Sequence, residues 1–395
     1  MVKDITQIFK EIGFLFVLYA FALYTSAYNN NVYFVFIFSV FSIITLPIRK
    51  YLDKTAIFLM LFSFTFVLIS YTLNVNTKSH FQMLCHFISP LIFYVFGRYT
   101  VDKLNKKDLI IIFILVTLFL FTIGTILSVY KSILENGIVS LDRNISIDGE
   151  NSVKAATLIG LLLSVNLAGI GIFIADKNRF KSLTSWIFLL LCICSLVCNM
   201  HMVNRTGIVL CAIVTVISIM YTNKKHFMKF IFILVALISL LWLLIENNII
   251  GSEIIEAYEQ RQEYDEINDR GITSERDVRW LFSLKQLFIH PFGWISIKHS
   301  LNDYAHNLWL DIARTTGLIP FTLMILASIN CIKDLIYVAK QKADMYNILI
   351  LSLLVIFLIS LFLEPIIDGA PLYLYLFLFI CGITRQSIIR KLTTT

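Results

Sequence analysis

The sequence predicts an all-α polytopic membrane protein with about twelve transmembrane helices and one large extracytoplasmic loop that contains amphipathic helices. Hydrophobic residues make up 58% of the 395 residues and charged residues only 15%. The mean hydropathy is +0.80, and such values exclude an ordinary soluble domain. The apolar residues also fall into runs of spanning length, whereas polar residues gather in one long segment, 247–305.

Each predicted span is an apolar run long enough to cross a bilayer, which takes about 20 residues. The runs are centred near residues 20, 40, 64, 90, 119, 164, 192, 214, 237, 320, 355 and 378. They divide the chain into an N-terminal group of nine spans (1–246), the long loop (247–305) and a C-terminal group of three spans (306–395).

The charges of the connections predict the orientation of the spans. Lys and Arg accumulate in short loops on the cytoplasmic side of a membrane. Seven alternate segments, which include both termini, hold 21 of the 33 basic residues and only eight of the 26 acidic residues. We therefore expect both termini on the cytoplasmic side and the long loop outside. The net charge of +7 arises mostly from this bias, so it does not indicate a nucleic-acid partner.

Neither the cysteines nor the acidic residues have the spacing of a metal site. The seven cysteines lie in or at the ends of apolar runs, where a thiol behaves as a small hydrophobic group. The acidic first half of the long loop, from Glu253 to Asp269, reads as a solvated helical face. The sequence therefore predicts neither a metal nor another cofactor.

Ionisable residues are rare within the apolar runs, because a charge in hydrocarbon costs at least ~2.5 kcal/mol. They cluster instead at predicted external helix ends, at His201, Arg205, Glu246, His306, Asp311 and Arg314. This clustering indicates a site near the external interface rather than a path through the membrane. His86 is the one candidate in the middle of a span, and we interpret it as a hydrogen-bonded packing residue.

Within the long loop, Ser274 and Asp277 fit the start of an amphipathic helix that Pro291 would end. Arg276 and Arg279 share one polar face of this helix. Such a face is often simply solvated, but a helix that buries its apolar side in a membrane brings its arginines to the phosphate zone. The planar guanidinium matches phosphate oxygens. For Arg205, the alternatives are an anion ligand and a side chain that extends to the interface.

His306 precedes the tenth apolar run, and an imidazole with an ordinary pKa of about 6.5 can accept a proton near neutral pH. A structural role at a helix end is the alternative. Asn307, Asp311 and Arg314 follow on one face, and their spacing allows an Asp311–Arg314 pair that also orients polar groups of a substrate. Aromatic residues near the loop could stack on sugar rings or anchor the interface: Trp280, Trp294, Tyr304 and Trp309.

Several short motifs resemble those of the O-antigen ligase and O-antigen polymerase superfamily. They are His306-Asn307 followed after nine residues by Gly317-Leu318-Ile319, Ser274-Glu275-Arg276 with Trp280, the turn His290-Pro291-Phe292-Gly293, and the short external segment at Arg205. The chain departs from the pattern at Pro320, where a small residue or tyrosine is usual. Its His-Pro turn is also one residue shorter and lacks a second glycine.

The resemblance implies a metal-independent glycosyltransferase of lipopolysaccharide or other surface polysaccharide biosynthesis. It would lie in a bacterial inner membrane and use undecaprenyl-diphosphate-linked oligosaccharide at the periplasmic face. Arg205 and Arg276 would hold the diphosphate, and His306 would activate or position the acceptor hydroxyl. The expected substrate contacts are Arg279, Trp280, Tyr304, Asn307, Asp311 and Arg314. Membrane lipid, chain-length regulators and flippase proteins are the other expected partners.

Three functions remain open at this point. Asp311, Arg314 and the ending Gly317–Pro320 look more like polymerase sequences, which favours transfer to a lipid-linked repeat unit. A ligase would transfer the finished glycan to lipid A core instead. A polysaccharide flippase, in which Arg205 and Arg276 guide lipid headgroups, is the alternative from another class. The predicted helices contain almost no charged residues, which argues against a flippase, because charged side chains would line the cavity of a flippase.

Overall fold

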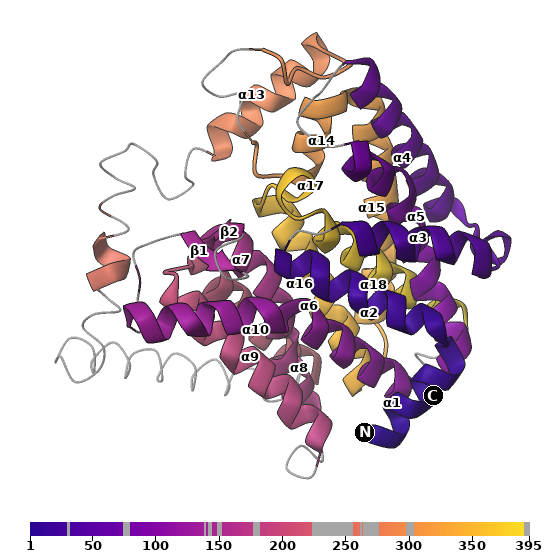
Figure 1. Ribbon diagram of the computed structural model, residues 1–395, viewed down its shortest axis with the longest axis vertical. Helices are drawn as coiled ribbons and strands as arrows, with labels where there is room; N and C mark the ends of the chain where they lie inside the picture. The colour runs from indigo at the N-terminus through magenta and orange to yellow at the C-terminus, as the bar shows by residue number, and fades with distance from the viewer. Residues whose placement is uncertain are drawn as a thin grey trace. The chain divides into compact units, whose positions relative to one another are not determined.

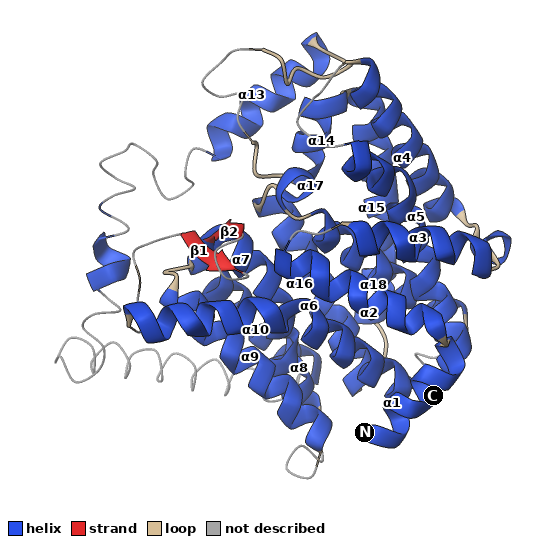
Figure 2. Cartoon of the chain, in the orientation of Figure 1, coloured by secondary structure: helices blue, strands red, loops and turns tan. Residues whose placement is uncertain are grey.

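Figure 1 shows the computed structural model of the chain, and Figure 2 shows that its regular structure is helical apart from one short hairpin. The structure describes residues 1–29, 32–73, 80–137, 140, 144–147, 152–176, 182–222, 256–260, 263, 276–297 and 304–390. The chain divides into two compact units that interleave along the sequence. One comprises Met1–Ile123, Glu275–Lys342 and Leu353–Thr395, and the other comprises Gly124–Ser274 and Ala343–Ser352.

Nine helices in the described part of the chain are long and apolar enough to cross a membrane. A tenth candidate is the pair Val2–Ile12 and Phe14–Thr25, which is bent by 108°. The predicted span near residue 40 corresponds to a shorter apolar helix, Tyr33–Thr45. The predicted span near residue 237 lies outside the described residues. The protein is therefore a helical, multi-pass membrane protein, and the count of about twelve spans stays a prediction.

The first unit contains most of the helices that position the candidate site. They are α1 (Val2–Ile12), α2 (Phe14–Asn29), α3 (Tyr33–Thr45), the 3-10 turn η1 (Ile48–Tyr51), α4 (Lys54–Thr72), α5 (His80–Leu104), α13 (Arg276–Ile289), α14 (Leu308–Thr316), α15 (Leu318–Ala339), α17 (Ile366–Gly369) and α18 (Pro371–Ile389). The long helices α6 (Lys107–Asn136) and α16 (Met345–Leu363) contribute residues to both units.

The core of the first unit forms where α5 packs against α18. A methyl group on Gly97 would collide with the carbonyl oxygen of Phe379, and one on Gly382 would collide with the carbonyl oxygen of Tyr94. Small residues at these crossing points let the two backbones approach closely, which is a common packing mode for helices in membranes. Every residue of α18 from Leu372 to Thr384 is buried, so this helix lies at the centre of the unit.

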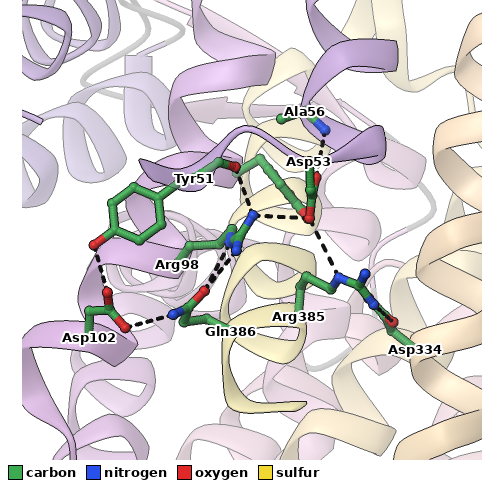
Figure 3. A network of polar contacts seen from close by, with 9 residues as sticks. Tyr51, Asp53, Ala56, Arg98, Asp102, Asp334, Arg385 and Gln386 are labelled. Atoms are coloured by element: carbon green, nitrogen blue, oxygen red, sulfur yellow. Dashed lines mark hydrogen bonds and ion pairs between the residues drawn. The ribbon is translucent and has the colours of Figure 1, made fainter. Parts of the chain in front are cut away.

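Arg98 of α5 connects η1, the residue before α4 and α18 (Figure 3). Its guanidinium donates to the carbonyl of Tyr51 at 2.7 Å and to Asp53 at 3.0 Å. It also donates twice to the side-chain oxygen of Gln386, at 3.0 and 2.9 Å. Arg98 is only 5% exposed, and these four contacts supply the partners that a buried guanidinium requires.

Three more charged groups, Asp102, Arg385 and Asp334, extend this network (Figure 3). Asp102 accepts hydrogen bonds from Tyr51 at 2.9 Å and from Gln386 at 2.7 Å. Arg385 lies 3.1 Å from Asp334 and 3.5 Å from Asp53. The sequence assigned these connections to the same side of the membrane from their basic residues, and within this unit the structure brings them together.

The second unit contains α7 (Ala156–Ser164), the 3-10 turn η2 (Val165–Leu167), α8 (Ala168–Ala175), α9 (Leu183–His201) and α10 (Arg205–Thr222). It also contains an antiparallel hairpin of β1 (Asn144–Ile147) and β2 (Ser152–Ala155), in which Asn144 pairs with Ala155. No strand was predicted here, so the hairpin is an addition to the predicted helical class. Its sequence signal is the pair Asp148-Gly149 between two short alternating runs, a pair typical of hairpin connections.

Helix α13 is the amphipathic helix predicted in the second half of the long loop; the expected start at Ser274 lies outside the described residues. Leu287 packs with Trp294 and Ala313, whereas Leu281 is 62% and Phe288 77% exposed. An uncovered apolar face is expected for a helix that lies against a bilayer. Trp294 is 1% exposed, so it is a core residue rather than an interfacial anchor.

Candidate functional site

The turn before α14 presents His306 in a constrained backbone conformation. His306 has a φ of 53°, in the left-handed region that non-glycine residues rarely adopt. The carboxylate of Asp311 accepts from the N–H of Ala305 at 2.8 Å and from the N–H of Asn307 at 3.2 Å. Because these two N–H groups flank His306, Asp311 holds its backbone from both sides. Such a conformation costs about 1–3 kcal/mol and needs this kind of support.

Asn307 anchors the same turn to the end of α16. Its side-chain oxygen caps α14 by accepting from the N–H of Leu310 at 3.2 Å. Its side-chain amide donates to the carbonyl of Phe362 at 3.3 Å. Asn307 is 4% exposed, and its contacts are with the protein itself.

The expected contact of Asn307 and Asp311 with a substrate stays a prediction; in the structure their side chains bond the protein. Asp311 is fully buried, and each of its oxygens accepts a backbone N–H. Burial raises the pKa of Asp311 to about 6, and the two backbone hydrogen bonds and Arg314 oppose this rise. Both residues shape the turn that carries His306.

Glu364 lies between two of the predicted catalytic residues. Its carboxylate, whose side chain is 5% exposed, directly follows α16. One oxygen, Oε1, lies 3.5 Å from Nη2 of Arg276, and the other, Oε2, lies 3.9 Å from Nδ1 of His306. Arg276 begins α13 and His306 precedes α14, so three separate segments of the first unit meet here.

Glu364 was not among the residues predicted for the site. The sequence does indicate Glu364 as a candidate, because it is the only charged residue between Met345 and Ile367 and lies at a predicted external helix end. Carboxylates at such ends are also common as solvated termini. Only the tertiary contact with Arg276 and His306 distinguishes Glu364 from those.

Two neighbouring residues attach α13 to the His306 turn. The indole N–H of Trp280 donates to the carbonyl of Ala305 at 2.8 Å. The Trp280 ring meets Phe362 edge to face, with ring centroids 5.0 Å apart. Arg279 donates to the carbonyl of Tyr304 at 3.4 Å. Trp280 and Arg279 therefore hold the loop at Tyr304–Ala305 in place.

The His-Pro turn docks on the junction between α14 and α15. The N–H of Leu318 donates to the carbonyl of Pro291 at 2.8 Å, and the N–H of Trp294 donates to the carbonyl of Arg314 at 2.9 Å. Gly293 and Gly317 have φ values of 105° and 81°, and a methyl group on either would collide with the facing backbone. The structure thus joins two of the motifs that carry the family resemblance.

Arg314 lines a small cavity in the first unit. Its guanidinium lies 3.4 Å from Asp368 of α17 and 4.9 Å from the centre of the Tyr304 ring. The sequence spacing allowed Asp311 to pair with Arg314. In the structure Arg314 donates its hydrogen bond to Asp368 instead, and it interacts with Asp311 only through charge. The cavity has a volume of about 120 Å³ and is lined by Gln82, His86, Ile295, Tyr304, Arg314, Ile367, Asp368 and Pro371.

His86 has the packing role expected from the sequence. Its Nδ1 lies 2.9 Å from the hydroxyl of Tyr375, and the ring packs edge-on against Phe66. The side chain is 3% exposed.

Arg205 belongs to the second unit, where it is the exposed first residue of α10. The turn before it is well defined, because the side chain of Asn204 accepts from the N–H of Thr206 at 3.1 Å. Arg205 also lies near Tyr258, where its positive charge opposes the rise in the tyrosine pKa that burial causes. The expected meeting of Arg205 with Arg276 and His306 stays a prediction.

Among the described residues, no three His, Cys, Asp or Glu side chains are grouped closely enough to hold a metal ion.

Comparison with known proteins adds no further assignment. The chain matches no protein-family model and no curated protein.

Proposed function

We propose that the protein is a membrane glycosyltransferase that polymerises O-antigen or a related surface polysaccharide. It transfers glycan from undecaprenyl diphosphate to a lipid-linked repeat unit at the external face of a bacterial inner membrane, without a metal. The proposal includes about twelve spans with both termini cytoplasmic. The observation that carries it is the meeting of Arg276, His306 and a buried carboxylate, Glu364, at the ends of three helices.

The proposed reaction uses His306 as a base and the arginines as ligands of the leaving group. Nε2 of His306 accepts the proton of the acceptor hydroxyl, whose oxygen forms a bond with the anomeric carbon of the donor. The bond between that carbon and the phosphate oxygen breaks, and its electron pair stays on the diphosphate. Guanidinium groups at Arg276 and Arg205 stabilise the additional negative charge through paired hydrogen bonds.

The small cavity beside Arg314 offers polar and apolar groups that could contact part of a sugar. The carboxylate of Asp368 and the amide of Gln82 can bond hydroxyl groups, and Ile295 and Pro371 offer apolar surface. Tyr304 is 43% exposed and two residues from His306. Trp280 is already engaged with the loop, so Tyr304 is the better of the two expected aromatic contacts with the glycan.

Transfer to lipid A core is the second candidate, because the same cluster would activate a hydroxyl of that acceptor and the motifs resemble both kinds of enzyme. A flippase is the third. In the described part of the first unit, the groups of interacting charges lie at helix ends, as in the network of Figure 3 and around Glu364. That distribution favours transfer at an interface over passage through the membrane.

Electrophoresis of surface glycan from a deletion strain tests the proposal. Loss of a polymerase leaves cores with a single repeat, whereas loss of a ligase leaves bare core and lipid-linked polymer. Complementation with His306→Ala or Arg276→Ala is expected to leave the same defect as the deletion. A normal ladder in the deletion strain, with no redundant gene, would exclude both transfer reactions.

Purified protein with synthetic lipid-diphosphate repeats tests the chemistry directly. Activity should persist in EDTA, and its abolition there would contradict the metal-independent mechanism. If His306→Ala and Arg276→Ala transferred glycan normally but blocked movement of lipid-linked sugar, the flippase would be correct.

A further inference from the structure

Two buried polar atoms face each other in the site without a hydrogen bond. They are Nδ1 of His306 and Oε2 of Glu364, which lie 3.9 Å apart, and neither has a hydrogen-bond partner. Leaving a buried polar group unsatisfied costs about 1–3 kcal/mol. One of these atoms is a potential donor and the other an acceptor, so a movement of about 1 Å would satisfy both.

We propose that Glu364 is a positioning residue for the transfer reaction, and this proposal rests on the proposed function. When substrate is bound, Oε2 accepts a hydrogen bond from Nδ1–H of His306. Oε1 meanwhile keeps its contact with Arg276. One carboxylate would then orient both the base and a ligand of the diphosphate.

The contact between His306 and Glu364 matters for the reaction because it selects the tautomer of the imidazole. A neutral histidine has one nitrogen that donates and one that accepts. A carboxylate at Nδ1 selects the tautomer with hydrogen on Nδ1, so the lone pair lies on Nε2, where the acceptor hydroxyl needs it. After proton transfer, the negative charge of Glu364 stabilises the imidazolium.

The surroundings allow the contact to close with little rearrangement. Asn307, which follows His306, is bonded to the carbonyl of Phe362, two residues before Glu364. The His306 turn and the end of α16 are thus already joined, and Asp311 fixes the backbone of the turn. Rotation of the imidazole and carboxylate is then sufficient. Catalytic hydrogen bonds are often long without substrate and shorten when it binds.

Arg276 retains donors for a phosphate while it contacts Glu364. A guanidinium has five N–H groups, and the contact with Oε1 engages only Nη2. The Arg276 side chain is 23% exposed, so part of it is accessible. Glu364 would therefore hold this side chain in place rather than compete with the diphosphate for all of its donors.

Steady-state kinetics of Glu364→Gln, with purified protein and synthetic lipid-diphosphate repeats, test the proposal. We expect kcat to fall by about 10²-fold or more. The acid limb of the kcat profile should move to lower pH, because the imidazolium loses its carboxylate partner. The charged groups that contact His306 or its turn are Glu364, Asp311 and Arg279. Arg276 contacts Glu364, and the charges of Arg314 and Asp368 act on Asp311. Glu364→Asp, which keeps the charge on a shorter side chain, should recover part of kcat and the original acid limb.

Two controls separate a positioning role from a structural one. Asp334→Asn removes another carboxylate that pairs with an arginine, Arg385 at 3.1 Å, in the network of Figure 3. It should lower the unfolding temperature without moving the pH profile. On the residual transfer activity of His306→Ala, Glu364→Gln should cause a smaller fold-loss than it causes in wild type, because only its effect on Arg276 remains.

The outcomes distinguish this proposal from the function on which it rests. If His306→Ala retains full transfer activity, the proposed mechanism itself is wrong. If His306→Ala is inactive but Glu364→Gln keeps the wild-type kcat and acid limb, only the role of Glu364 is wrong. If Glu364→Gln fails to fold, Glu364→Asp provides the test. A lower unfolding temperature of Glu364→Asp with an unchanged kcat would also overturn the proposal.

Discussion

At the scale of single residues, buried polar groups determine the geometry of the candidate site. Asp311 holds the backbone on both sides of His306, and Asn307 joins the turn to α16. Both were expected to touch substrate, since a polar residue next to a candidate base reads that way in sequence. That contact stays a prediction. In the structure Asp311 bonds two backbone N–H groups, because an enclosed carboxylate needs donors and these are the nearest.

Asp311 should give the folded protein a specific pH dependence. Its ordinary pKa of 3.8 rises to about 6 on burial. A carboxyl group with a raised pKa contributes stability that is fully present below its unfolded pKa and is lost as pH rises through about 6. The stability of wild type relative to Asp311→Asn should therefore increase by about 1 kcal/mol from pH 7 to pH 5. Thermal unfolding in detergent at both pH values measures this difference, and a constant difference would contradict the burial of an ionisable group.

At the scale of elements, close helix packing and one amphipathic helix place the site. Helix α13 reaches the His306 turn through Trp280 and Arg279. Its residues were predictable because the apolar period is a local property. The crossing of α5 and α18 depends on which glycines face each other, and a single sequence does not show this.

Gly97→Ala should destabilise the first unit. The added methyl group meets the carbonyl of Phe379, so α5 and α18 must separate, at a cost of about 1–3 kcal/mol. The higher helix propensity of alanine offsets this destabilisation by up to about 1 kcal/mol. Leu84→Ala is the control, because Leu84 is 43% exposed on the same helix. We expect a clearly lower unfolding temperature for Gly97→Ala than for Leu84→Ala; equal temperatures would argue against the close crossing.

At the scale of the whole molecule, the three predicted catalytic residues are divided between two compact units. Arg276 and His306 belong to the unit that contains Glu364, and Arg205 belongs to the other. The proposed reaction requires Arg205 to reach the same diphosphate as Arg276. This requirement makes the approach of the two units a testable part of the mechanism.

Cross-linking of introduced cysteines tests that approach. In a background without the seven native cysteines, Arg205→Cys and Arg276→Cys should be joined by a short bis-maleimide. Arg205→Cys with Lys285→Cys is the control, because Lys285 lies nine residues, or about 13 Å, farther along α13. Mass spectrometry of the linked peptides should show a much higher yield for the first pair. A higher yield for the control would contradict a shared diphosphate site.

The sequence alone determined the multi-pass helical class, the amphipathic helix α13 and the prediction of a site around His306 and Arg276. These follow from local composition, apolar period and short motifs. The strands Asn144–Ile147 and Ser152–Ala155 were also indicated locally, by the pair Asp148-Gly149 between two short alternating runs, but they were not predicted. Only the tertiary structure decided that Glu364 lies between Arg276 and His306, and that Arg314 pairs with Asp368. Such contacts depend on which distant segments the packed helices bring together, and a buried charge then takes whatever partner lies within reach.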